Sequence, residues 1–184
     1  MVEEAQIVEG CIKNDSQCKA LLYKQYASSL YGVALRYAKT EEDAQDILQD
    51  AFLRIFDNIE QYGGKGSLFA WLAKIVIHQA CTFHHERSKA ILVDYEDYEE
   101  MIADESIVES DKLTHQVLLG FIRELSQTYQ TVFNLCAIDG YSGREAAKKL
   151  NCTEAICRAR LFKARNMLKK KVNKFLEKEN KIQR

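Results

Sequence analysis

Four basic side chains follow one another at short intervals in the C-terminal part of the chain: Arg158, Arg160, Lys163 and Arg165. Arginine can form paired hydrogen bonds with the edge of a guanine base, and lysine and arginine both pair with phosphates. If this segment is a helix, one of its faces is apolar and consists of Cys157, Leu161, Ala164, Leu168 and Val172. The spacing therefore predicts a helix with a buried stripe and a basic outer surface that fits the major groove of DNA. A solvated basic helix is the alternative.

Turn and capping residues just before this segment predict a second, shorter helix. The sequence reads "GYSGREAAKKLNCTEAICRARLFKAR" from Gly140 to Arg165. Ser142 is suited to cap the short helix, Asn151 to end it in a left-handed conformation, and Thr153 to cap the basic helix. Two helices joined by a three-residue turn, with the second longer and more basic, indicate a helix-turn-helix.

Residues that could support catalysis or bind a metal do not form a recognisable pattern. There is no glycine-rich phosphate loop and no spacing typical of a catalytic triad. The six cysteines form no C-x-x-C pair, so we expect neither a disulfide framework nor a zinc site. Cys81 and His85, in "CTFHH", fall on one helical face, but two ligands do not complete a tetrahedral site. We expect no enzyme, no metal, no cofactor and no small-molecule substrate.

The composition predicts an all-α chain. The sequence has 184 residues, no proline and only eight glycines. Residues 91–111 contain nine acidic side chains and no lysine or arginine, whereas residues 139–184 contain fourteen basic and five acidic ones. This charge asymmetry favours a polyanionic partner for the C-terminal part. No run of apolar residues is long enough to span a membrane, and the acidic N-terminal segment does not resemble a signal peptide. We therefore expect a cytoplasmic protein without membrane insertion.

The N-terminal block shows three amphipathic segments. The first, residues 18–38, has apolar residues at helical spacing. Thr40 is suited to cap the second, which has an apolar side and a polar side. Ser67 is suited to cap the third after the break at "GGKGS". We therefore expect two small helical domains, 1–89 and 112–184, joined by an acidic linker at 90–111.

Both blocks resemble one protein family. "LSQTYQTVFNLCAIDGYSGREAAKKLNCTEAICRARLFKARNML" resembles region four of RNA polymerase sigma factors of the extracytoplasmic-function (ECF) class. "EDAQDILQDAFLRIF" and "GSLFAWLAKIVIHQA" resemble region two of the same class, in the same order along the chain. The resemblance covers about nine-tenths of the chain. It implies a transcription initiation factor that binds core RNA polymerase, directs it to promoters and assists melting of the −10 element.

The resemblance also implies three sets of binding residues. The implied partner is core polymerase, with its β′ clamp and β subunits. The residues implied to bind core polymerase are Asp43, Asp46, Gln49, Asp50, Arg54 and Asp57. Binding of the −10 element falls to Lys65, Ser67, Phe69, Trp71, Lys74, His78 and Arg87, although Trp71 is also typical of a core residue. Binding of the −35 element falls to Ser142, Arg144, Thr153, Glu154, Arg158, Arg160, Lys163 and Arg165. An anti-sigma factor is a further implied partner.

The recognition helix departs from the family pattern, because Ala155, Ile156 and Ala159 stand where small or hydroxyl residues are common. Two other interpretations stay open. One is a stand-alone helix-turn-helix regulator, which would explain the C-terminal block but not the first. The other is a protein-interaction module derived from a sigma factor that no longer reads promoters.

Overall fold

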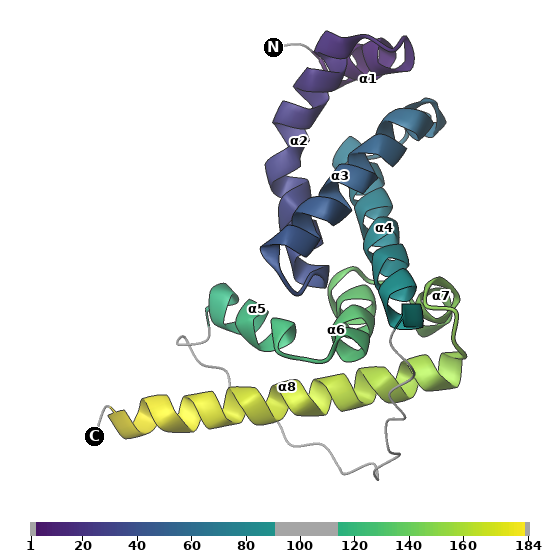
Figure 1. Cartoon of the computed structure of the whole chain (residues 1–184). Helices are drawn as coiled ribbons and strands as arrows, with labels where there is room; N and C mark the ends of the chain where they lie inside the picture. Colours follow the sequence, from purple (N-terminus) through teal and green to yellow (C-terminus); the bar gives the residue numbers. More distant parts are fainter. Residues whose placement is uncertain (1–2, 91–113, 183–184) are drawn as a thin grey trace. The chain divides into compact units, whose positions relative to one another are not determined.

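The computed structural model of this protein describes residues 3–90 and 114–182 (Figure 1). These residues form α-helices and two short turns of other helical types, without a strand among them. The all-α prediction is confirmed. The chain divides into two compact units, Met1–His84 and His85–Arg184. The exact domain limits expected from the sequence stay a prediction, and residues 91–113 of the acidic segment lie outside the described residues.

Four α-helices begin in the first unit, and the last of them ends just beyond it. They are α1 (Glu4–Ile12), α2 (Ser16–Tyr37), α3 (Glu41–Asn58) and α4 (Leu68–Ala90), with the 3₁₀ turn η1 (Ile59–Gln61) after α3. Asp15 caps α2 by accepting from the backbone N–H groups of Gln17 and Cys18 at 2.7 and 3.2 Å. Thr40 caps α3 through its Oγ1, which accepts from the Asp43 N–H at 3.1 Å, as the sequence predicts. These caps satisfy backbone donors that have no partner within the helix.

The apolar side of α3 is buried in this unit, as the spacing predicts. Its buried residues are Ala44, Ile47, Leu48, Ala51, Phe52 and Ile55. Leu22 and Leu30 of α2 and Leu72 of α4 are completely inaccessible and belong to the core of the same unit. At the C-terminal part of α4, His84 Nε2 lies 2.8 Å from the carbonyl oxygen of Tyr37. This contact joins α4 to the C-terminal end of α2.

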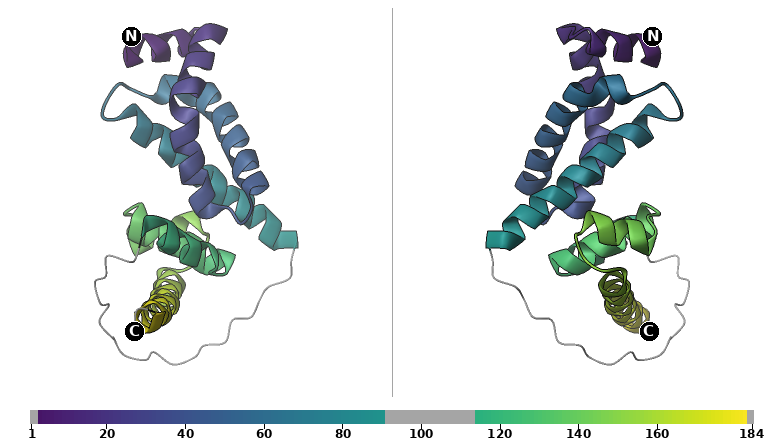
Figure 2. Two further views of the ribbon diagram at one scale, coloured as in Figure 1. Left: turned by 90° about the vertical axis from the view of Figure 1, so that its left-hand side faces the viewer. Right: turned by 90° about the vertical axis from the view of Figure 1, so that its right-hand side faces the viewer.

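The second unit contains the other four described α-helices. They are α5 (His115–Arg123), α6 (Gln127–Phe133), α7 (Gly143–Lys149) and α8 (Glu154–Ile182), with a π-helical turn η2 (Asn134–Ile138) after α6. Helix α8 is a single straight rod, seen from the side in Figure 1 and nearly along its axis in Figure 2. Its 29 residues span about 43 Å.

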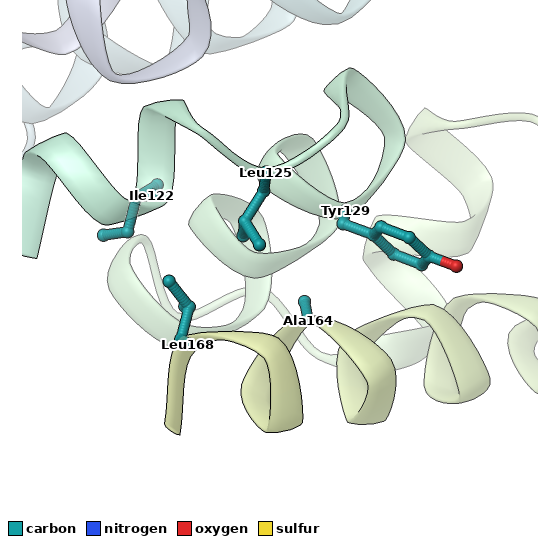
Figure 3. Packing of buried hydrophobic residues seen from close by; sticks show 5 residues of the cluster. All are labelled: Ile122, Leu125, Tyr129, Ala164 and Leu168. Atoms are coloured by element: carbon teal, nitrogen blue, oxygen red, sulfur yellow. The ribbon is translucent and has the colours of Figure 1, made fainter. Parts of the chain in front are cut away.

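A hydrophobic cluster closes α5 and α6 onto α8. Its buried members are Ile122, Leu125, Tyr129, Ala164 and Leu168. In Figure 3, Leu168 and Ala164 rise from α8 beneath Leu125, and the Tyr129 ring extends to one side. Farther along α8, Phe175 packs edge-on against Phe121 of α5 with ring centroids 5.8 Å apart. Lys171 of α8 forms an ion pair with Glu124, which follows α5. Helix α8 therefore contributes both to the helix-turn-helix and to the core that supports it.

Three local features of this unit differ from what residue type or helical periodicity indicates. Ser126 occupies the N-cap position of α6, but its side chain accepts no capping hydrogen bond. After α6 the helix widens into the π turn at Asn134–Ile138. In the apolar stripe of α8, Cys157, Ala164, Leu168 and Val172 are buried, whereas Leu161 is only half-buried.

No helix within residues 3–90 and 114–182 is long and apolar enough to cross a membrane.

Candidate functional site

The exposed side of α3 presents a row of polar residues. Asp46, Gln49, Asp50, Arg54 and Asp57 are all exposed, and Asp43 is half-buried. Residues three, four and seven positions apart lie on the same side of a helix, so most of this row forms one continuous face. We call this row, together with Leu53, the α3 face.

Two features of the α3 face were not predicted from the sequence. Leu53 is 64% exposed in the middle of the acidic row, although it is a large apolar residue. Asp50 is held by Gln79 of α4, whose Nε2 donates to Asp50 Oδ2 at 3.1 Å while the rest of the glutamine is buried. The exposed position of Leu53 could have been read from its phase, because it lies three residues after Asp50 and four before Asp57.

The loop between η1 and α4 brings together part of the second predicted set. Figure 2 shows this loop standing out before the chain enters α4. Gly64 and Gly66 have φ values of 69° and 83°, which favour glycine, and the Tyr62 hydroxyl donates to the Gly66 carbonyl at 2.7 Å. The Tyr62 ring also lies 5.7 Å from the half-buried Trp71 ring. The loop therefore has a defined shape with an aromatic pair at its base.

The α4 residues of this set fall on two sides of the helix. Ser67, Trp71, Lys74 and His78 are spaced by four, three and four residues, so they share one side. Ser67 caps the helix through a 3.3 Å bond from the Ala70 N–H. Phe69 is 38% exposed but lies on a different side, two residues from both Ser67 and Trp71.

Two further members of the set lie apart from this row. Lys65 is exposed in the loop. Arg87 lies in α4, but its side chain is outside the described part of the protein.

The helix-turn-helix forms with the geometry that the sequence predicts. Ser142 and Glu145 make a complete capping box at the start of α7: the Ser142 Oγ accepts from the Glu145 N–H at 3.2 Å, and Glu145 Oε2 accepts from the Ser142 N–H at 2.9 Å. Asn151 has φ 50°, and Thr153 Oγ1 accepts from the Ile156 N–H at 3.2 Å. All three capping and turn roles in this motif are confirmed.

The matches to protein families follow the two units. The sigma-70 region 2 family matches residues 22–90, which include the α3 face and the loop. The sigma-70 region 4 family matches residues 115–168, which include the helix-turn-helix. The chain belongs to the sigma-70 family. Sigma factors are transcription initiation factors that bind core RNA polymerase and promoter DNA, so this chain is a sigma factor and not an enzyme.

Similar proteins extend over nearly the whole chain. The ECF RNA polymerase sigma-E factor of Haemophilus influenzae is 23% identical over 90% of this chain and 93% of its own length. The RNA polymerase sigma-H factor of Pseudomonas aeruginosa is 24% identical over 95% of this chain and 96% of its own length. The solved structure of the sigma factor RpoE in complex with the anti-sigma factor NepR from Bartonella quintana has a TM-score of 0.50 and 19% identity, and the match covers 82% of this chain and 94% of that chain. At this level of identity, the match to the solved structure shows a similar fold.

In region 4 of this sigma factor, the predicted DNA-binding residues differ in exposure. Arg144, Thr153, Glu154, Arg158 and Arg165 are exposed, and Lys163 is half-buried. Arg158 is also paired with Glu154 at 3.0 Å, one helical turn away. Ser142 is exposed, but its hydroxyl takes part in the capping box.

Arg160 lies on a different side of the recognition helix, next to a group of thiols. It is half-buried, and its positive charge acts on the thiols of Cys152 and Cys157. Burial raises the pKa of Cys157 to about 12 and also raises the pKa values of Cys136 and Cys152. These thiols therefore stay protonated at neutral pH and serve as packing groups. The charge of Arg160 therefore lies close to Cys152, which belongs to the turn before α8.

Removing the cap of α7 tests the local energetics of region 4. We expect Ser142→Ala to lower the free energy of unfolding by about 1 kcal/mol, because the Glu145 N–H loses its acceptor. Ser126→Ala is the matched control and should cost less, about 0.5 kcal/mol or below, because Ser126 makes no capping bond. Urea unfolding followed by circular dichroism measures both. Equal losses in the two variants would contradict the assigned capping role.

Proposed function

We propose that this protein is a sigma factor of the ECF class that docks on the β′ clamp of core RNA polymerase through the α3 face. The observation that supports this most directly is the exposed row of carboxylates in region 2 with Leu53 at its centre. Carboxylates on a rigid helix suit a partner surface rich in arginine. An exposed leucine inside such a row is typical of an interface anchor that becomes desolvated on binding.

The −10 element is assigned to the loop at 62–67 and to one side of α4. Single-stranded DNA is bound by aromatic stacking surfaces and positive charge, which Tyr62, Trp71 and Lys74 supply within a short distance along the chain. Ser67 and His78 add hydrogen-bonding groups on the same side of α4. Phe69 lies on another side and is a weaker candidate, while Lys65 and Arg87 complete the proposed set.

The −35 element is assigned to the recognition helix. In a helix-turn-helix, the N-terminal residues of the second helix reach the base edges, and residues before it contact the backbone. Glu154 and Arg158 occupy the reading positions at the start of α8. Ser142, Arg144, Thr153, Arg160, Lys163 and Arg165 are proposed as positioning contacts to phosphates.

Two further proposals concern regulation and location. The chain is held inactive by an anti-sigma factor, as the class implies. It acts in the cytoplasm, where core polymerase and promoter DNA are found.

Run-off transcription tests the proposed function. Purified core polymerase is incubated with fragmented genomic DNA from the source organism, with and without this protein. Discrete new transcripts that depend on the protein are the expected result. Core binding without transcripts would favour the interaction-module alternative, and DNA binding without any core binding would favour the stand-alone regulator.

Truncating Leu53 tests its role as an anchor. We expect Leu53→Ala to weaken core binding about tenfold, because the side chain loses a desolvated apolar contact. Its thermal unfolding should barely change, because 64% of Leu53 is already exposed. Leu21→Ala, at a 40% exposed leucine of α2, is the control and should leave the affinity unchanged. Fluorescence anisotropy of the labelled protein with core polymerase gives the affinity of each variant. Equal affinities for Leu53→Ala and wild type would contradict the role of Leu53 as an anchor.

A further inference from the structure

The outer side of the recognition helix is mostly apolar where it would meet DNA. Ala155, Arg158 and Ala159 are exposed, and Phe162 is half-buried. These four residues are spaced by three, one and three positions, so they form one side of α8. Cys157 and Ala164, which are fully buried, mark the opposite side. We call these four residues the outer side of α8.

The chemistry of this side limits what it can read. Alanine and phenylalanine side chains have no hydrogen-bond donor or acceptor. Arg158 is the one ion within the outer side, and Glu154 already holds its guanidinium at 3.0 Å. In the major groove, the C5-methyl of thymine is the base group that apolar side chains contact. A side made of two alanines and a phenylalanine therefore matches thymine methyl groups and leaves purine hydrogen bonding to Arg158.

We propose that the outer side of α8 reads thymines in the upstream promoter element through their C5-methyl groups, with Ala155 and Ala159 as the contacting residues. This inference rests on the proposed −35 function and deepens it by naming the base group that is recognised. The two alanines lie one helical turn apart, about 6 Å, whereas base pairs rise about 3.4 Å per step. The two contacted thymines therefore lie one or two base pairs apart.

Small side chains at these positions also determine how closely the helix can approach the bases. An alanine methyl group reaches a thymine methyl only when the helix backbone lies deep in the groove. Phe162, one turn beyond Arg158, adds an apolar wall on the same side. Replacing an alanine by a polar residue of similar size therefore changes the contact without changing the depth of docking.

Deoxyuridine substitution tests the proposal, because deoxyuridine differs from thymidine by the C5-methyl alone. The preferred upstream element is first selected from a randomised duplex library, using the protein bound to core polymerase. Each thymine of the element, and thymines of the flanking duplex as controls, are then replaced by deoxyuridine, one at a time. We expect about a fourfold loss of affinity at each of two thymines, the value of one buried methyl group, and no loss at thymines outside the element.

Variants then assign the contacts to residues. For the Ala159→Ser variant, replacing one of the two thymines by deoxyuridine should no longer lower the affinity, because the serine hydroxyl replaces the apolar contact with the methyl group. Ala20→Ser changes an exposed alanine of α2 in the same way and should keep both losses. If wild type selects an element and transcribes from it but binds its deoxyuridine form equally well, the methyl readout is overturned and the sigma function stands. If no element is selected and no transcript forms, both fail.

Discussion

The double variant Asp46→Arg/Asp50→Arg is expected to lose about 100-fold or more in affinity for core polymerase. Both carboxylates are exposed on the α3 face, and Asp50 also accepts a hydrogen bond from Gln79. At the proposed interface each arginine would meet positive charge, and close like-charge contacts cost several kcal/mol. The affinity is measured by fluorescence anisotropy without DNA, and transcription should fall in parallel.

Single variants separate the charge effect from damage to the fold. Asp50 accepts a hydrogen bond from buried Gln79, so Asp46→Arg alone is the cleaner change. Glu41→Arg is the matched control, because Glu41 is exposed at the start of the same helix but lies on another side. We expect a large loss for Asp46→Arg and little for Glu41→Arg. Equal losses would place the docking surface elsewhere.

Leu125→Ala is expected to unfold region 4 while leaving region 2 intact. Leu125 is 1% exposed at the centre of the cluster that joins α5, α6 and α8 (Figure 3). Leucine-to-alanine changes at such sites cost about 2–5 kcal/mol. A unit of this size has a total stability of similar magnitude. Helical content should therefore fall, and transcription from promoters should stop.

Limited proteolysis and core binding show how far this damage extends. A resistant fragment ending near His84 is expected, because Met1–His84 is compact by itself. Met167→Ala, at a 38% exposed position of α8, should behave like wild type. If Leu125→Ala also removes the N-terminal fragment, the two units depend on one another for stability.

The parts of the fold that were predictable from sequence depend on local rules. Thr40, Ser142 and Thr153 cap their helices because a hydroxyl at that position can reach a free backbone N–H two or three residues later. The apolar side of α3 followed from helical periodicity alone. Asp15 was missed as a cap, although its carboxylate stands directly before α2 and gives the same kind of signal.

No local sequence pattern indicates the other features. The π turn at Asn134–Ile138 has no distinctive residue type, and Ser126 lacks its capping bond despite a favourable type. The Gln79–Asp50 bond joins residues 29 positions apart. The candidate site was therefore predictable as a set of residue types on helices. The grouping of Ser67, Trp71, Lys74 and His78 without Phe69 also follows from helical spacing, whereas the aromatic pair of Tyr62 and Trp71 does not.

The placement of α8 has a consequence for the nascent chain. Ala164 and Leu168 complete the core of region 4, and they lie C-terminal to every helix that this core supports. Region 2 ends at residue 90, and translation at roughly 5–20 residues per second needs several more seconds to produce α8. During that interval the ribosome presents region 2, with the proposed docking face and −10 reader, without a folded −35 reader. On the proposed assignments, a chain released early would occupy polymerase without directing it to an upstream element.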